Sequence, residues 1–111
     1  MAKAIRIHQY GGPEVLQYES VEVGQPGPDE VRLRQTAVGL NFIDVYHRTG
    51  LYPLPQLPGS LGLEAAGVVE SIGSEVESLK VGDRVAYAGG PIGAYTSERL
   101  MPAERLIRIP D

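Results

Sequence analysis

Apolar and polar residues alternate along most of the chain, which is the pattern of β-strands with one buried face. The alternation is approximate over residues 2–10, recurs over 16–23 at positions 16 and 18 and then at 21 and 23, and is clearest over 31–40, where the strand ends in a continuously apolar stretch. Further segments of the same type lie in the second half of the chain, at 64–73, 83–88, 94–101 and 105–110. The pattern therefore predicts a mainly β fold built from short strands.

One segment has a helical period instead. In NFIDVYHRTG (41–50) the apolar residues fall at positions 42, 43, 45 and 46, which is the spacing of one helix face. Asn41 is a favourable N-cap, Asp44 suits the positive end of the helix dipole, and Gly50 can end the helix in a left-handed conformation. The sequence predicts one short helix near residues 41–48.

The loops between these elements are rich in glycine and proline. The chain contains 14 Gly and 9 Pro, and such residues favour turns. No internal repeat, low-complexity segment or interdomain linker is visible, and a chain of 111 residues suits one compact unit. We therefore expect a single domain over residues 1–111, folded as a small barrel or sandwich.

Composition narrows the chemistry. The chain has no cysteine and only two histidines, so thiol catalysis and thiolate-bound zinc are excluded and metal dependence is not expected. The net charge is −4 with scattered Lys and Arg, which argues against a nucleic-acid-binding surface. No apolar run suits a membrane span or a signal peptide, so we expect no membrane partner and a cytoplasmic location.

The stretch LGLEAAGVV (61–69) places one carboxylate, Glu64, among glycines and small apolar residues. A buried charge without a partner is costly. Glu64 should therefore face water or serve a site.

Aromatic residues gather in one region. Residues 41–52 hold Phe42, Tyr46 and Tyr52, three of the seven aromatic residues of the chain. Tyr46 follows Phe42 by four positions, so the pair could equally be a core-facing helix stripe, and Asn41 could be only a cap. Tyr52 lies in a predicted loop, where a phenol that can stack and hydrogen-bond suits a ligand site better than a core.

Three stretches resemble a known family: GPEVL (12–16), AVGLNFIDVYHRTGLYP (37–53) and LGLEAAGVVESIGSEVESLKVGDRVAY (61–87). They are similar to the N-terminal domain of the medium-chain dehydrogenase/reductases, in the zeta-crystallin-like NADPH:quinone oxidoreductase branch. The resemblance implies a GroES-like, partly open β-barrel that forms one wall of a cleft. It also implies a second, Rossmann-type domain, which we expect to be absent from this chain and to carry most of the NADPH site and a homodimer interface.

The resemblance also bears on zinc. Zinc alcohol dehydrogenases have Gly-His-Glu where this chain has Gly62-Leu63-Glu64, and their first cysteine ligand corresponds to Asn41. Leucine cannot bind a metal and asparagine is a poor zinc ligand. The resemblance therefore implies the zinc-independent branch, with Glu64 as a hydrogen-bonded carboxylate that supports the site rather than a catalytic base.

The implied activity is transfer of a hydride or electrons from NADPH to a quinone. No residue is assigned as an acid or base. The substrate pocket would contain Tyr46, Tyr52 and Leu63, and the cofactor would contact Asn41, Phe42, Ile43, Asp44 and Tyr46, in part through free N–H groups at the helix start. We expect the isolated domain to be inactive. The alternatives are an enone or enoyl-thioester reductase of the same superfamily, and a non-catalytic GroES-like binding module.

Overall fold

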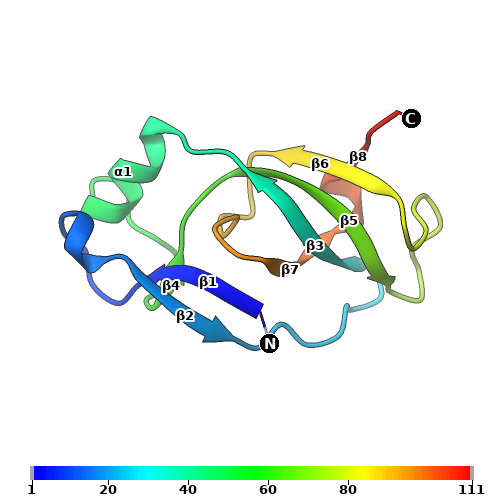
Figure 1. Cartoon of the computed structure of the whole chain (residues 1–111), viewed down its shortest axis with the longest axis horizontal. Coiled ribbons are helices and arrows are strands. Elements are labelled where there is room, and N and C mark those ends of the chain that lie inside the picture. Colours follow the sequence, from blue (N-terminus) through cyan, green and yellow to red (C-terminus); the bar gives the residue numbers. More distant parts are fainter. Residues whose placement is uncertain (1, 111) are drawn as a thin grey trace.

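The computed structural model describes residues 2–110, which form two antiparallel sheets and one α-helix (Figure 1). The smaller sheet has the order β2-β1-β4, made of Gln17–Val21, Ala2–Ile7 and Gly59–Ser60. The larger sheet has the order β7-β3-β5-β6-β8, made of Glu98–Pro102, Glu30–Val38, Glu64–Ile72, Arg84–Ala88 and Ile107–Arg108. The predicted mainly β, partly open fold is confirmed, and the described residues contain no Rossmann-type sheet.

Each sheet buries its own cluster of apolar side chains. In the larger sheet the cluster contains Val31 and Leu33 of β3, Val69 of β5 and Val85 of β6, on the alternating positions that the sequence pattern marks as one face. Beneath the smaller sheet Ile7, Val15, Leu54 and Leu61 form a second cluster. The two sheets therefore have separate cores.

The segment before β7 joins the two sheets. Ala4 of β1 forms an isolated bridge with Thr96, and the N–H of Ile5 donates to the carbonyl of Tyr95 at 2.8 Å. From the larger sheet, the side-chain amide of Gln35 donates to the carbonyls of Ala94 and Thr96, both at 2.8 Å. Residues 94–97 therefore use their backbone groups in these bonds rather than in the strand pairing that the alternation over 94–101 predicts.

The predicted strand at 94–101 is therefore wrong in its first half, because β7 begins only at Glu98. The strand predicted at 2–10 ends at Ile7, and the one predicted at 105–110 shrinks to two residues after the 3₁₀ turn η2 (Ala103–Arg105). A second 3₁₀ turn, η1 (Pro13–Val15), and the short strand β4 were not predicted.

The helix α1 runs from Phe42 to Thr49, in agreement with the prediction. Asn41 is its N-cap, and Gly50 ends it at φ 89°, where the N–H of Gly50 donates to the carbonyl of Tyr46. That left-handed conformation favours glycine. Figure 1 shows α1 at one end of the molecule, beyond the ends of β1 and β3.

Candidate functional site

The start of α1 is bonded to the start of β5. The side-chain amide of Asn41 donates to Oε2 of Glu64 at 3.1 Å, and the backbone N–H of Gly39 donates to the carbonyl of Glu64 at 3.1 Å. Both Asn41 and Glu64 are exposed. The charge that looked out of place in the sequence therefore faces water and accepts a hydrogen bond from the Asn41 amide. That Glu64 supports a binding site stays a prediction.

Asp44, in the first turn of α1, is a buried acid with only 4% of its surface exposed. Its Oδ2 accepts hydrogen bonds from the hydroxyl of Tyr95 at 2.5 Å and from the N–H of Asn41 at 3.1 Å. Its own N–H donates to the carbonyl of Asn41 at 3.0 Å. The prediction that the N–H of Asp44 is free for a cofactor is therefore wrong, and this residue holds the helix start in place.

The phenol of Tyr95 is fixed from the other side by Gly62. Gly62 has φ +99°, and a Cβ at this position would lie 2.6 Å from the Tyr95 ring, so only glycine fits. The carbonyl of Gly62 accepts the N–H groups of Gly93 and Ala94. Burial, and after it the hydrogen bond to Asp44, raises the pKa of Tyr95. The phenol therefore stays neutral and donates a hydrogen bond to the carboxylate.

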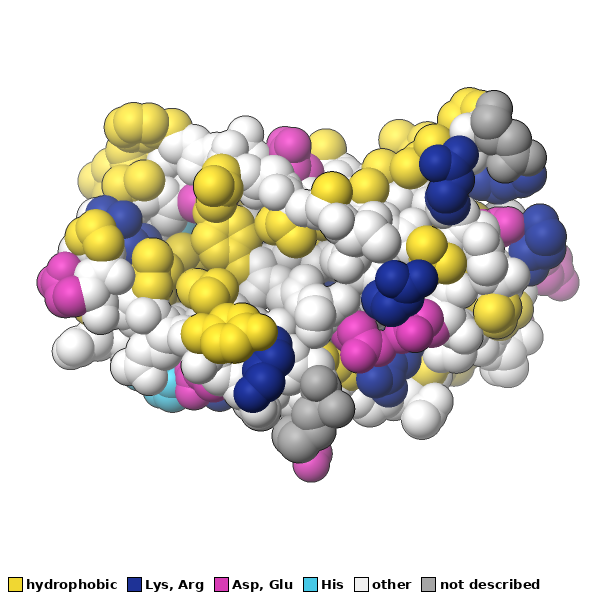
Figure 2. All heavy atoms as spheres, viewed as in Figure 1, with side chains coloured by type: hydrophobic (Ala, Val, Ile, Leu, Met, Phe, Trp, Pro, Cys, Tyr) yellow, Lys and Arg dark blue, Asp and Glu magenta, His cyan; other side chains and the backbone are white. Residues whose placement is uncertain are grey.

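Three aromatic rings form a row along α1 and the loop after it. The rings of Phe42 and Tyr46 lie 5.4 Å apart at 72°, and those of Tyr46 and Tyr52 lie 5.4 Å apart at 80°. Phe42 is 71% exposed and Tyr52 is 50% exposed. Figure 2 shows hydrophobic side chains gathered over the part of the molecule where α1 lies. In the helix stripe considered from the sequence as a core face, Phe42 is thus exposed, whereas Tyr46 is half-buried.

The loop that carries Tyr52 is held by backbone and side-chain bonds. The carbonyl of Tyr46 accepts the N–H of Tyr52 at 3.2 Å, and the hydroxyl of Tyr10 accepts the N–H of Leu54 at 3.0 Å. Arg48 donates from Nε to the carbonyl of Gly11 at 3.1 Å, which fastens the end of α1 to the 8–12 turn. These hydrogen bonds therefore fix the positions of α1 and of the loop that carry the aromatic row.

The structure brings together Asn41, Phe42, Tyr46, Tyr52 and Glu64 on or beside α1. Leu63 and Ile43 are half-buried, and their places in a pocket stay predictions. Sequence reasoning missed Tyr95 and Tyr10, because the partner of Tyr95 lies 51 residues away in the chain and no local pattern marks such a contact.

The chemistry available at this site is a row of edge-to-face aromatic rings beside an exposed amide. Helix geometry leaves the N–H groups of Phe42 and Ile43 without an intrahelical acceptor. Within residues 2–110 no group of three His, Cys, Asp or Glu side chains is placed to hold a metal ion. Nor does any helix in that range have the length and apolar character needed to cross a bilayer.

Comparisons with known proteins match most or all of the chain. The family model of the alcohol dehydrogenase GroES-like domain matches residues 27–111. A quinone oxidoreductase from Pseudomonas aeruginosa is 58% identical over 100% of the chain and 34% of its own length. A 2-haloacrylate reductase from a Burkholderia species is 50% identical over 99% of the chain and 34% of its own length.

Solved structures agree. The structure of Escherichia coli quinone oxidoreductase complexed with NADPH has a TM-score of 0.94 and 45% identity, over 97% of this chain and 33% of that one. The chain thus spans about a third of the length of the curated relatives it matches.

Proposed function

Because the chain belongs to the alcohol dehydrogenase GroES-like domain family, we propose that it is the substrate-side domain of an NADPH-dependent quinone reductase. The observation that carries this proposal is the 58% identity with a quinone oxidoreductase along the full chain. The NADPH-bound relative of 45% identity supports the choice of cofactor.

The residues at the α1 site fit the polar edge of a nicotinamide cofactor. When it is bound, a nicotinamide supplies the hydride. The exposed amide of Asn41, oriented by Glu64, and the N–H groups of Phe42 and Ile43 would hold its amide or ribose oxygens. Tyr46 would lie between this polar group and the acceptor.

The acceptor is proposed to rest on the aromatic row. Quinones are flat and readily reduced, so orienting the ring and excluding water are the main contributions a protein must make. Tyr46 and Tyr52 offer ring surfaces and hydroxyls for that purpose, and Leu63 would add an apolar wall. Neither step requires an acid or base from this chain.

Further parts of the proposal rest on the same family membership. We infer that the reaction is independent of zinc, because the chain has no cysteine and has Leu63 at the ligand position. We also infer that a Rossmann-type domain supplies most of the NADPH site and a homodimer interface. The GroES-like domain of residues 1–111 would then be inactive by itself. We place the protein in the cytoplasm.

A second candidate is a reductase of activated alkenes. The 2-haloacrylate reductase is 50% identical to this chain, and its name denotes an alkene conjugated to a carboxylate rather than a quinone. Hydride delivery to such a carbon–carbon double bond needs the same arrangement of nicotinamide and acceptor. A non-catalytic GroES-like binding module is the third candidate.

The test is an acceptor screen on the protein that contains this domain together with its nucleotide-binding domain. NADPH oxidation would be followed with 1,4-benzoquinone, with 2-chloroacrylate and with an enone. Oxidation that depends on the quinone supports the proposal. Oxidation only with the alkenes would replace it with the second candidate, and oxidation with none of them would favour the binding module.

A further inference from the structure

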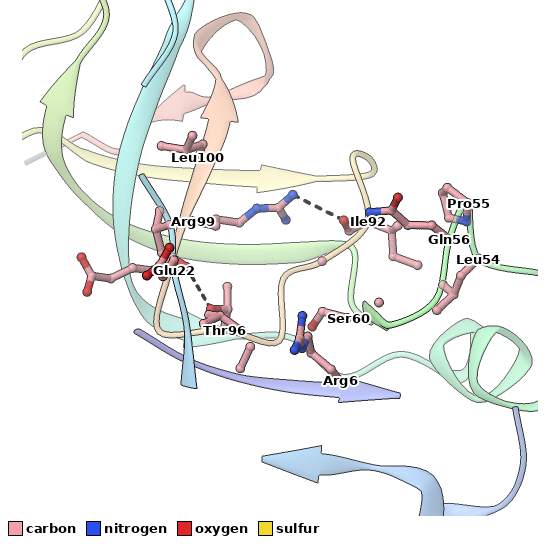
Figure 3. Close-up of a pocket in the computed structure, with 16 residues that line it drawn as sticks. Arg6, Glu22, Leu54, Pro55, Gln56, Ser60, Ile92, Thr96, Arg99 and Leu100 are labelled. Atoms are coloured by element: carbon pink, nitrogen blue, oxygen red, sulfur yellow. Dashed lines mark hydrogen bonds between the residues drawn. The ribbon is translucent and has the colours of Figure 1, made fainter. Parts of the chain in front are cut away.

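A separate cavity lies between the two sheets, away from the aromatic row (Figure 3). Its volume is about 420 Å³, within the range of sites that hold small molecules. Its walls come from β1, β4 and β7, from the end of β2 with residues 22–23, and from the segments 54–56 and 92–96. None of Asn41, Phe42, Tyr46 and Tyr52 lines it, so it is not the site described above.

Arg99 of β7 places a fixed positive charge on the wall of this cavity. Its Nη2 donates to the carbonyls of Pro91 at 3.1 Å and Ile92 at 3.4 Å, and its Nη1 donates to the hydroxyl of Tyr87 at 3.1 Å. All three acceptors are neutral. Among residues 2–110 no carboxylate lies within 4.0 Å of Arg99. A guanidinium held in this way, partly removed from water, attracts an anion.

The acid next to Arg99 does not neutralise it. Glu98 also lines the cavity, but its carboxylate pairs with Arg32 at 3.2 Å. Glu22 lies on the left of Figure 3, on the opposite side of the cavity from Leu54 and Pro55. Among residues 2–110, Arg99 therefore lines the cavity without an ion-pair partner.

Arg6 of β1 adds a second guanidinium. Its Nε donates to Glu19 at 3.1 Å, while its two Nη groups have no acceptor among the described residues. Figure 3 shows the Arg6 and Arg99 side chains reaching toward the same space, beside Ser60 and Ile92. Two guanidinium groups that face one space are suited to the oxygens of a carboxylate or a phosphate.

The same end of the cavity also has an apolar wall. Leu54, Pro55 and Ile92 line it and lie together on the right of Figure 3. We propose that this cavity binds a small organic anion, with its carboxylate or phosphate between Arg6 and Arg99 and its apolar group against Leu54 and Ile92. This site is distinct from the proposed quinone site and does not depend on it.

The test uses three ligands of similar shape and different charge. Benzoate, phenyl phosphate and neutral benzyl alcohol would be titrated into the protein at low ionic strength, with binding followed by calorimetry and by NMR. We expect at least one anion to bind about tenfold more tightly than benzyl alcohol, as charge-assisted hydrogen bonds imply. Whichever anion binds more tightly identifies the acidic group as a carboxylate or a phosphate.

Variants then locate the anion. Arg6→Gln, which removes one ion pair on the surface, should weaken anion binding about tenfold, whereas Arg105→Gln, at an exposed arginine outside the cavity, should not change it. The amide signals of Ser60 and Ile92 should shift more than that of Tyr52. Anions that bind no better than benzyl alcohol, or that bind equally well to the Arg6→Gln variant, would overturn the proposal.

Discussion

The hydroxyl of Tyr95 donates a 2.5 Å hydrogen bond to the buried carboxylate of Asp44. This bond joins the segment between the two sheets to the first turn of α1, and Oδ1 of the same carboxylate is buried without a partner among the described residues. Tyr95 is thus one of two donors to the buried carboxylate of Asp44, beside the N–H of Asn41. The position of Asn41, whose N–H also donates to Asp44, depends on the same contact.

Replacing Tyr95 by Phe should destabilise the fold by about 1–3 kcal/mol, because it leaves a buried carboxylate with one hydrogen bond fewer. Denaturant unfolding measures this change. Tyr18→Phe is the matched control, since Tyr18 is 70% exposed and its loss of a hydroxyl should leave the free energy of unfolding nearly unchanged. Equal stability of the two variants would contradict the role given to the Tyr95 hydroxyl.

Stability should also fall in alkali. The pKa of Tyr95 is raised above its usual value of 10.0 by burial and by Asp44, and burial raises the pKa of Tyr87 as well. Above about pH 10 the unfolded chain loses phenol protons that the folded chain keeps, so the unfolded state binds fewer protons and the free energy of unfolding decreases with pH. Below that pH the contribution is fully present. Tyr95→Phe should show a shallower alkaline decrease in denaturant unfolding, and parallel curves would refute this.

Glu64 is expected to act through Asn41. In the protein with its nucleotide-binding domain, Glu64→Ala should raise the KM for NADPH about threefold to tenfold with little change in kcat, because it removes the acceptor that orients the Asn41 amide. Glu64→Gln keeps an oxygen acceptor and should change the KM less. A Glu64→Gln variant without turnover would instead identify Glu64 as a catalytic base.

Tyr52 should matter for turnover more than for folding. Tyr52→Ala should lower kcat/KM for a quinone about tenfold, through loss of ring contact with the acceptor. Because the side chain is half-exposed, the thermal midpoint should move little. The control is Tyr18→Ala, on β2. Kinetics that match the wild type would remove Tyr52 from the proposed site.

Residues 1–111 alone should bind NADPH only weakly. The α1 site offers an amide and two N–H groups, whereas the proposed Rossmann-type domain would supply the phosphate contacts. Calorimetric titration should give a dissociation constant well above about 1 µM. Tighter binding would show that these residues form a cofactor site by themselves.

Elements with local signals could be predicted from the sequence. The bounds of α1 follow from Asn41, the helical spacing and Gly50, and strands β3, β5 and β6 of the larger sheet follow from alternation. The first half of the 94–101 prediction failed because the amide of Gln35, far away in the chain, takes the carbonyls of Ala94 and Thr96. A two-residue strand such as β4 exists only through its pairing with β1, so it leaves no periodic pattern.

In the candidate site, too, features formed by residues close in sequence could be predicted, whereas contacts between distant residues could not. The cluster of Phe42, Tyr46 and Tyr52 is readable because these residues are close in sequence. The role of Asp44 is not, because its burial depends on Tyr95 and on the conformation of Gly62. Periodicity reports which face of an element is apolar, but it does not report which distant donor meets a buried acid.

The residues that fasten α1 and those that form its open aromatic face are different residues. Asp44 and Arg48 anchor the helix to segments remote in the chain, while Phe42 and Tyr52 face outward. Substitutions on the open face therefore cost little folding free energy. The exposed positions 42 and 52 can therefore vary, by natural drift or by library design, and change the preference of the proposed acceptor site while the scaffold stays the same.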